Sequence, residues 1–315
     1  MPTAILFLVL GVLWGASFLL IKVGLRGLTP AQVGLLRLAL GALTLTAVML
    51  VTRRAWPREP RLLGNLAVTA VLLFAIPVAL YSWAGQFLPS GVSAILNAAT
   101  PLMTLLVSAV ALRGERLRSV QVWGILIGAA GIVLVVSPWQ GARAGETVSG
   151  LHWPAVMACL LATLSYGCAY TWMRTLLHSP AAKRGTLDPL SLTTVQLLIA
   201  TLLSAAVAPW TGALEAPRSV DAMIVTAMLI LGVFSTGIGY LWNTSITASW
   251  GPVRASQVTY LTPVVGVALG AFILAEPVDV LQLIGTAVVL VGILLTQRPH
   301  TQSRHSSELT STTVS

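Results

Sequence analysis

The chain has 315 residues, of which 56% are hydrophobic and 9% are charged, with a formal net charge of +9. This composition excludes an ordinary soluble domain, because too few polar side chains are present to cover an apolar core with a water-facing surface. In a soluble protein a basic balance would favour nucleic acid, but in an apolar chain it is typical of the basic loops that orient a membrane protein. We therefore expect no nucleic-acid partner.

Apolar runs recur along the chain, separated by breaks that contain charged residues, Pro or Gly. A run of roughly 18–25 apolar residues is long enough to cross a bilayer as a helix. The runs predict ten transmembrane helices, near residues 3–25, 31–51, 65–87, 91–112, 120–137, 152–176, 190–209, 221–243, 252–274 and 279–297. The expected fold class is an all-α polytopic membrane protein.

The Lys and Arg residues predict how the chain is oriented. With ten spans both termini lie on one side, and most Lys and Arg residues fall in the breaks on that same side, as in the run from Arg53 to Arg61 and in Arg113–Arg118. Because basic loops stay in the cytoplasm, both termini are expected there.

One stretch occurs twice and divides the chain into two units. Ser93–Pro101 contains Thr-Pro and leads to a Gly-Glu-Arg sequence, and Ala255–Pro263 contains Thr-Pro and leads to Ala-Glu-Pro. The expected units are residues 1–140 and 150–298, followed by a disordered tail at 299–315. Five helices per unit is an odd number, so the second unit is expected to be inverted. Inverted repeats are typical of secondary transporters, whose substrate site lies near the midplane between the repeats.

These features carry a family resemblance over about residues 3–297. The features are ten spans, an early Trp14-Gly15, Thr-Pro in the fourth and ninth helices, Glu115 and Glu276 after them, and Gly-rich fifth and tenth helices. Together they resemble the EamA-type transporters of the drug/metabolite transporter superfamily. The resemblance implies an inner-membrane carrier that moves a small organic metabolite, such as an amino acid, often outward and by alternating access.

The middle of the bundle is where the sequence predicts a substrate site. Pro101 and Pro263 remove backbone donors, so we expect kinked helices and free carbonyls at Asn97 and Thr259, which hydrocarbon tolerates only beside protein or a wet cavity. Aromatic rings mixed with amides and hydroxyls are typical of small-molecule sites. The expected substrate-binding residues are Trp14, Tyr81, Trp83, Gln86, Asn97, Thr100, Tyr166, Tyr240, Asn243 and Thr259. The alternative interpretation is packing and interhelical hydrogen bonding without a ligand.

Three charged residues are candidates for gating or charge recognition. Arg37 lies six residues inside the second expected helix, where a charge indicates function by default, although its long side chain could also reach the surface. Glu115 and Glu276 lie at helix ends, where a gate or a loop ion pair is expected. No carboxylate or histidine lies in the middle of a span, so the hypothesis is a site of neutral polar and aromatic groups in a facilitator or exchanger.

Two other classes of protein remain as alternatives. A channel would need a conducting pore, which two inverted units around kinked helices do not suggest. A membrane-embedded enzyme would need a nucleophile with a base or a metal cluster, and the sequence suggests no catalytic residue, metal or cofactor. The expected partners are a small-molecule substrate, the lipid bilayer and, as an open alternative, a second copy of the chain in a homodimer.

Overall fold

A computed structural model describes residues 3–112, 118–137, 152–177, 188–250, 255 and 257–296. Every regular element in these residues is helical, which confirms the expected all-α class. Nine helical stretches among them are long and apolar enough to cross a membrane, and Val280–Thr296 is a further, shorter apolar helix. The tail expected at 299–315 lies outside the described residues.

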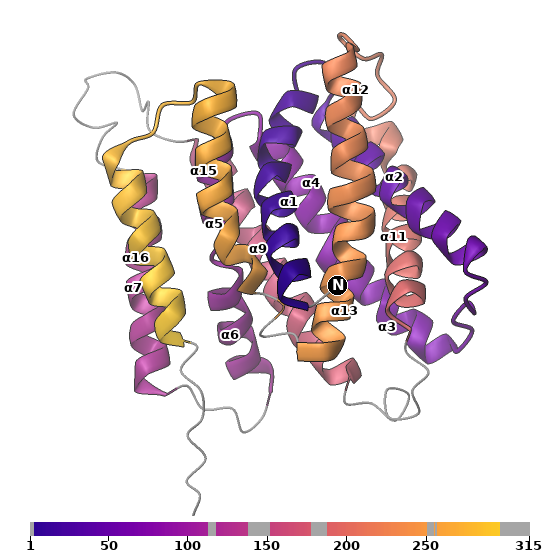
Figure 1. Cartoon of the computed structure of the whole chain (residues 1–315), viewed down its shortest axis with the longest axis horizontal. Coiled ribbons are helices and arrows are strands. Elements are labelled where there is room, and N and C mark those ends of the chain that lie inside the picture. The colour runs from indigo at the N-terminus through magenta and orange to yellow at the C-terminus, as the bar shows by residue number, and fades with distance from the viewer. Residues whose placement is uncertain are drawn as a thin grey trace, which may run out of the picture.

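The helices follow the apolar runs in chain order (Figure 1). Their bounds are α1 (Thr3–Gly24), α2 (Pro30–Val51), α3 (Pro60–Ala70), π-helix η1 (Val71–Ala75), α4 (Ile76–Ala84), α5 (Ser90–Asn97), α6 (Thr100–Ala111), α7 (Ser119–Val136), α9 (Trp153–Leu177), α11 (Pro189–Ala206), the 3-10 turn η2 (Ala208–Trp210), α12 (Ala222–Leu229), π-helix η3 (Ile230–Ile238), α13 (Gly239–Trp250), the 3-10 turn η4 (Gln257–Tyr260), α15 (Leu261–Leu274) and α16 (Val280–Thr296).

Two boundaries differ clearly from the expected ones. The third span begins at Pro60 instead of residue 65. A proline is tolerated in the first helical turn because the backbone N–H that it lacks would have no intrahelical partner there. The eighth span continues to Trp250 instead of ending at 243, since residues 244–250 contain no Gly or Pro.

The fourth and ninth spans are broken just before their prolines. Ala98 and Ala99 separate α5 from α6, and the 3-10 turn η4 leads into α15. The carbonyls expected to be free are occupied, and that expectation is wrong. The hydroxyl of Thr100 donates to the Asn97 carbonyl at 2.7 Å, and the hydroxyl of Thr262 donates to the Thr259 carbonyl at 2.6 Å. The threonine of each Thr-Pro pair therefore replaces the bond that the proline removes.

Helices from the first half of the chain pack against helices from the second. α1 packs against α15, and α9 packs against α6 and α4. α2 packs against η3, and α11 packs against α3 and η1. α7 and α16 form a pair at one edge of the bundle (Figure 1). The middle of the molecule therefore lies between helices of both halves.

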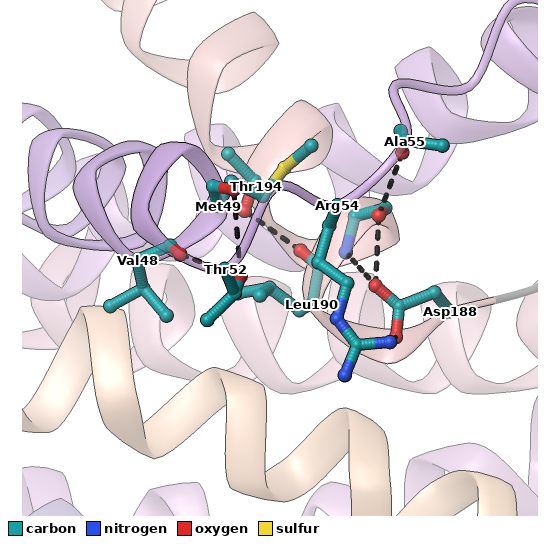
Figure 2. A network of polar contacts seen from close by, with 9 residues as sticks. Val48, Met49, Thr52, Arg54, Ala55, Asp188, Leu190 and Thr194 are labelled. Atoms are coloured by element: carbon teal, nitrogen blue, oxygen red, sulfur yellow. Dashed lines mark hydrogen bonds and ion pairs between the residues drawn. The ribbon is translucent and has the colours of Figure 1, made fainter.

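Polar contacts join neighbouring segments at the two ends of the bundle. At the end where α11 begins, Asp188 accepts a hydrogen bond from the Ser191 amide at 3.1 Å and lies 3.9 Å from Nη1 of Arg54, and the Ser191 hydroxyl donates to the Ala55 carbonyl at 3.0 Å (Figure 2). These contacts hold the chain after α2 against the first turn of α11. At the opposite end, Arg218 donates its backbone N–H to the Gly27 carbonyl at 2.9 Å.

Candidate functional site

A narrow cavity lies between the helices of the two halves. Its volume of about 30 Å³ is enough for about two water molecules. The residues that line it are Trp14, Ser17, Phe18, Arg37, Tyr81, Asn97, Thr100, Tyr166, Tyr170, Tyr240 and Thr259. In this conformation the space in the cavity is smaller than an organic metabolite.

One wall of the cavity is an aromatic pair that joins the first and eighth spans. The rings of Trp14 and Tyr240 lie 5.0 Å apart, and the ring of Phe74 lies 4.4 Å from that of Tyr240. The indole N–H of Trp14 donates to the Ser235 carbonyl at 3.1 Å. Ser235 belongs to π-helix η3, and π-helices are frequent at functional sites. The indole is therefore fixed by a polar contact as well as by packing.

A second aromatic pair joins the third and sixth spans. The rings of Tyr81 and Tyr166 lie 6.3 Å apart, and Phe18 packs against Tyr81 edge to face at 5.2 Å. The hydroxyls of Tyr166 and Tyr240 lie 3.2 Å apart, which links the two aromatic pairs by a hydrogen bond. The result is a continuous aromatic lining with hydroxyl groups in it, the mixture that orients small organic ligands.

The broken fourth span contributes the amide of the cavity. Asn97, the last residue of α5, is 5% exposed and accepts a hydrogen bond from the Tyr81 hydroxyl at 3.1 Å. Thr100 lines the same cavity from the start of α6, and Thr259 lines it from η4. The two Thr-Pro segments thus meet at one place, as their repetition in the sequence predicts.

Arg37 brings a positive charge into the cavity. It lies seven residues after Pro30, about 10 Å along α2, and its side chain is 5% exposed. Its Nε donates to the Thr236 hydroxyl of η3 at 2.8 Å, so the side chain is held inside the bundle and does not reach the surface. The cavity therefore contains one charged side chain beside the neutral polar and aromatic groups that the sequence predicts. An ion taken out of water costs several kcal/mol unless a partner compensates it.

Other residues expected in the site lie elsewhere. Trp83 is 37% exposed and packs against Phe87 and His152 at 5.1 Å and 6.0 Å. Gln86 is exposed and donates to the Trp83 carbonyl at 3.1 Å. Asn243 is fully buried and donates to the Tyr170 hydroxyl at 3.3 Å, so it supports a residue of the cavity wall. Glu115 lies outside the described residues.

Sequence reasoning missed Ser17 and Phe18 as cavity residues. They follow Trp14 by three and four residues, so all three share one face of α1, and this spacing is the signal that identifies them. The hydroxyl of Ser17 lies 2.8 Å from that of Ser235, which adds a second polar contact between α1 and η3.

A wider vestibule of about 620 Å³ lies at the end of the bundle that carries the turn between α15 and α16, and Lys22, Arg26, Arg218 and Glu276 are among its lining residues. The carboxylate of Glu276 accepts hydrogen bonds from the backbone N–H and hydroxyl of Ser90 at 2.9 Å and 2.7 Å, at the first residue of α5. It also lies 3.7 Å from the Lys22 ammonium. Glu276 therefore joins α1, α5 and the turn after α15.

Membrane-length helices around a small central cavity define a polytopic membrane protein with an internal site. The sequence profile of the EamA-like transporter family matches residues 1–137 and 153–298, and the chain belongs to this family. It is therefore a transporter of the drug/metabolite type.

Relatives agree with this class. The chain is 26% identical over 286 residues to an uncharacterized inner membrane transporter of Escherichia coli strain K12, covering 90% of this chain and 87% of the relative. It is 26% identical over 297 residues to a probable amino-acid metabolite efflux pump of the same organism, covering 92% and 93%. A solved crystal structure, 21% identical, superposes with a TM-score of 0.62 over 94% of this chain and 98% of its own, and is similar in fold. The chain is thus a multi-pass membrane protein.

Proposed function

We propose that this transporter is a secondary carrier that exports a small organic metabolite, such as an amino acid or a related compound, by alternating access around the central cavity. The observation that carries the proposal is the narrow cavity between helices of both halves, with a volume of about 30 Å³. A metabolite enters so small a space only if helices move apart. A carrier that opens to one side at a time makes that movement.

An inverted repeat would make this movement symmetric. The pairing of the helices supports such a repeat. Trp14 of α1 corresponds in the repeat to Tyr166 of α9, and Tyr81 of α4 corresponds to Tyr240 of α13. Trp14 packs against Tyr240, and Tyr166 lies beside Tyr81, so each member of one pair has its counterpart in the other. The pairing of α1 with α15 and of α9 with α6 follows the same exchange. Units 1–140 and 150–298 then form the two inverted halves.

Outward transport of an amino-acid-like substrate is supported by the relative named as a probable amino-acid metabolite efflux pump. Both termini are proposed to be cytoplasmic, on the grounds of the Lys and Arg distribution. A phosphatase or fluorescent-protein fusion at the C-terminus tests the orientation directly. A periplasmic C-terminus would contradict the proposed orientation.

Counterflow in proteoliposomes tests the proposed carrier. Vesicles loaded with one unlabelled amino acid or organic acid at a time should take up the same labelled compound transiently, with a rate that saturates as its concentration rises. Trp14→Ala should lower the rate, whereas Trp123→Ala, on the exposed side of α7, should leave it unchanged. A flux that never saturates would instead indicate a channel. Accumulation against a gradient under an imposed pH difference would contradict a facilitator or exchanger.

A further inference from the structure

Arg37 is held in the cavity by its inner nitrogen. Its Nε donates to the Thr236 hydroxyl at 2.8 Å, and Thr236 is itself fully buried and donates to the Leu231 carbonyl at 2.8 Å. This is the one hydrogen bond that the described residues give to Arg37. The side chain lines the cavity, so the two terminal nitrogens of its guanidinium group, Nη1 and Nη2, remain to bind a ligand.

The charge of Arg37 has no acidic partner within the described part of the chain. No carboxylate is among the described residues that line the cavity. The acidic residues of the two described ion pairs are Glu276, beside Lys22, and Asp188, beside Arg54, at the two ends of the bundle. A buried guanidinium is stabilised most by a carboxylate that accepts two parallel hydrogen bonds. We therefore expect the carboxylate that pairs with Arg37 to belong to a ligand that enters with each transport cycle.

Apart from Arg37, the described residues that line the cavity are neutral. Its aromatic rings suit an apolar or aromatic body, and Asn97 and the tyrosine hydroxyls can bind neutral polar groups. An ammonium group would meet no anionic acceptor among the described residues of the cavity and would be repelled by Arg37. Its remaining attraction would be to the aromatic faces. The charges thus favour an anionic end on the substrate and do not require a cationic one.

Position 37 also distinguishes the two halves of the chain. Arg37 follows Pro30 by seven residues, and Gln196 follows Pro189 by seven, so the second half has a neutral amide at the matched place. Gln196 is 1% exposed and donates to the Thr69 hydroxyl at 2.6 Å, and it is absent from the cavity lining. A single charged anchor on one side of the cavity orients the substrate in one direction.

From these contacts we propose that Arg37 binds the carboxylate of the transported compound, and that the substrate class is compact monocarboxylates with an apolar or aromatic body, whether or not they carry an α-amino group. The proposal rests on the proposed carrier function. It extends that function by assigning recognition to the carboxylate alone, so the matched acids that lack the amino group are substrates and the matched amines are not.

Three sets of matched compounds test the proposal by counterflow. Each set holds an amino acid, the acid without its amino group and the amine without its carboxylate: alanine, propanoate and ethylamine; leucine, 4-methylpentanoate and isoamylamine; phenylalanine, 3-phenylpropanoate and phenethylamine. In any set that exchanges, the two carboxylates should exchange and the amine should not. Exchange of an amine without its matched acid would overturn the proposal.

A binding assay on the purified protein separates this inference from the carrier function. At least one of the three acids should raise the apparent Tm, and the concentration needed should rise at least tenfold in Arg37→Gln. Arg37→Lys, which keeps the charge without the planar fork, should lie between the two. Arg58→Gln, in the exposed chain before α3, is the matched control and should behave as wild type. A shift of equal size in wild type and both Arg37 variants, or a shift by no acid, would refute carboxylate binding at Arg37. Binding of an acid without counterflow by any compound would refute the carrier function and leave the Arg37 site supported.

Thr236→Val tests whether the side chain is positioned by its Nε contact. The variant keeps the charge but removes the acceptor, so it should weaken binding of the acid severalfold without making any amine a ligand. If Thr236→Val binds the acid as wild type does, the Nε contact does not position Arg37.

Discussion

The ring of Trp14 lies 5.0 Å from the ring of Tyr240, although the two residues are 226 positions apart in the sequence. The contact joins α1 to the helix that continues from η3, and both rings line the central cavity. It is the place where the two halves of the chain meet over the proposed substrate site.

Replacing Trp14 should impair transport more than removing the hydroxyl of Tyr240. Trp14→Ala removes an aromatic wall and the donor to the Ser235 carbonyl, so we expect at least a tenfold lower counterflow rate. Tyr240→Phe keeps the ring and loses only the 3.2 Å contact with the Tyr166 hydroxyl, so its effect should be a few-fold. Rates are normalised to folded protein by size-exclusion chromatography. Equal effects of the two variants would contradict a wall formed by the indole.

Asn97 and Tyr81 should act as a pair. Asn97→Ala and Tyr81→Phe each break the 3.1 Å hydrogen bond between them, so the double variant should transport no worse than the more impaired single variant. Both single variants should insert and fold normally, because they remove one hydrogen bond worth about 0.5–1.5 kcal/mol. A double-mutant cycle of counterflow rates measures the coupling. Additive losses would show that the bond does not organise the site.

The carboxylate of Glu276 should stabilise the end of the bundle next to the vestibule. Glu276→Gln weakens the acceptor at the first residue of α5 and removes the charge beside Lys22, so the apparent Tm in detergent should fall by a few degrees. Lys22→Gln should cost less, because its side chain is 30% exposed and the pair is partly screened by solvent. The double variant should lose less than the two single losses together. An unchanged Tm in Glu276→Gln would contradict a stabilising contact.

Two glycines offer opposite outcomes for the same substitution. A Cβ on Gly131 of α7 would lie 2.6 Å from the Val289 backbone nitrogen of α16, so Gly131→Ala should force the pair apart and lower the Tm and yield of folded protein. A Cβ on Gly64 of α3 would meet nothing within 4 Å, so Gly64→Ala should stabilise its helix by about 0.5–1 kcal/mol. Thermal denaturation in detergent checks both. A shift of the Tm in the same direction in both variants would contradict the claim that the close packing of α7 on α16 requires a glycine at position 131.

Periodicity and repetition predict much of this molecule. The apolar runs predict the helices because the bilayer requires spans of a definite length. The repeated Thr-Pro segments point to Asn97, Thr100 and Thr259, which the structure brings to one cavity. A donor to the Asn97 carbonyl was not predicted from the sequence. The proline removes its backbone donor, but the hydroxyl of Thr100, the residue before the proline, donates to it instead.

The rotation of each helix about its axis was harder to predict. Trp83 follows Tyr81 by two residues, so it lies on nearly the opposite side of α4 and faces away from the cavity that Tyr81 lines. The burial of Arg37 depends on Thr236, a residue 199 positions away, and no local pattern reveals that contact. Local spacing therefore identifies helices and repeats, but only tertiary packing decides which face encloses the cavity.

Chemical protection of a cysteine in the cavity tests the central claim most directly. Ser17→Cys is introduced after Cys159→Ala and Cys168→Ala remove the native thiols, and Thr211→Cys, on an exposed turn, is the control in the same background. The rate of labelling by a small membrane-permeant thiol reagent is measured with and without a saturating amount of a compound that shows counterflow. We expect the compound to slow labelling at position 17 at least fivefold and to leave position 211 unchanged. Equal labelling rates at position 17 with and without the compound would contradict a substrate site in this cavity.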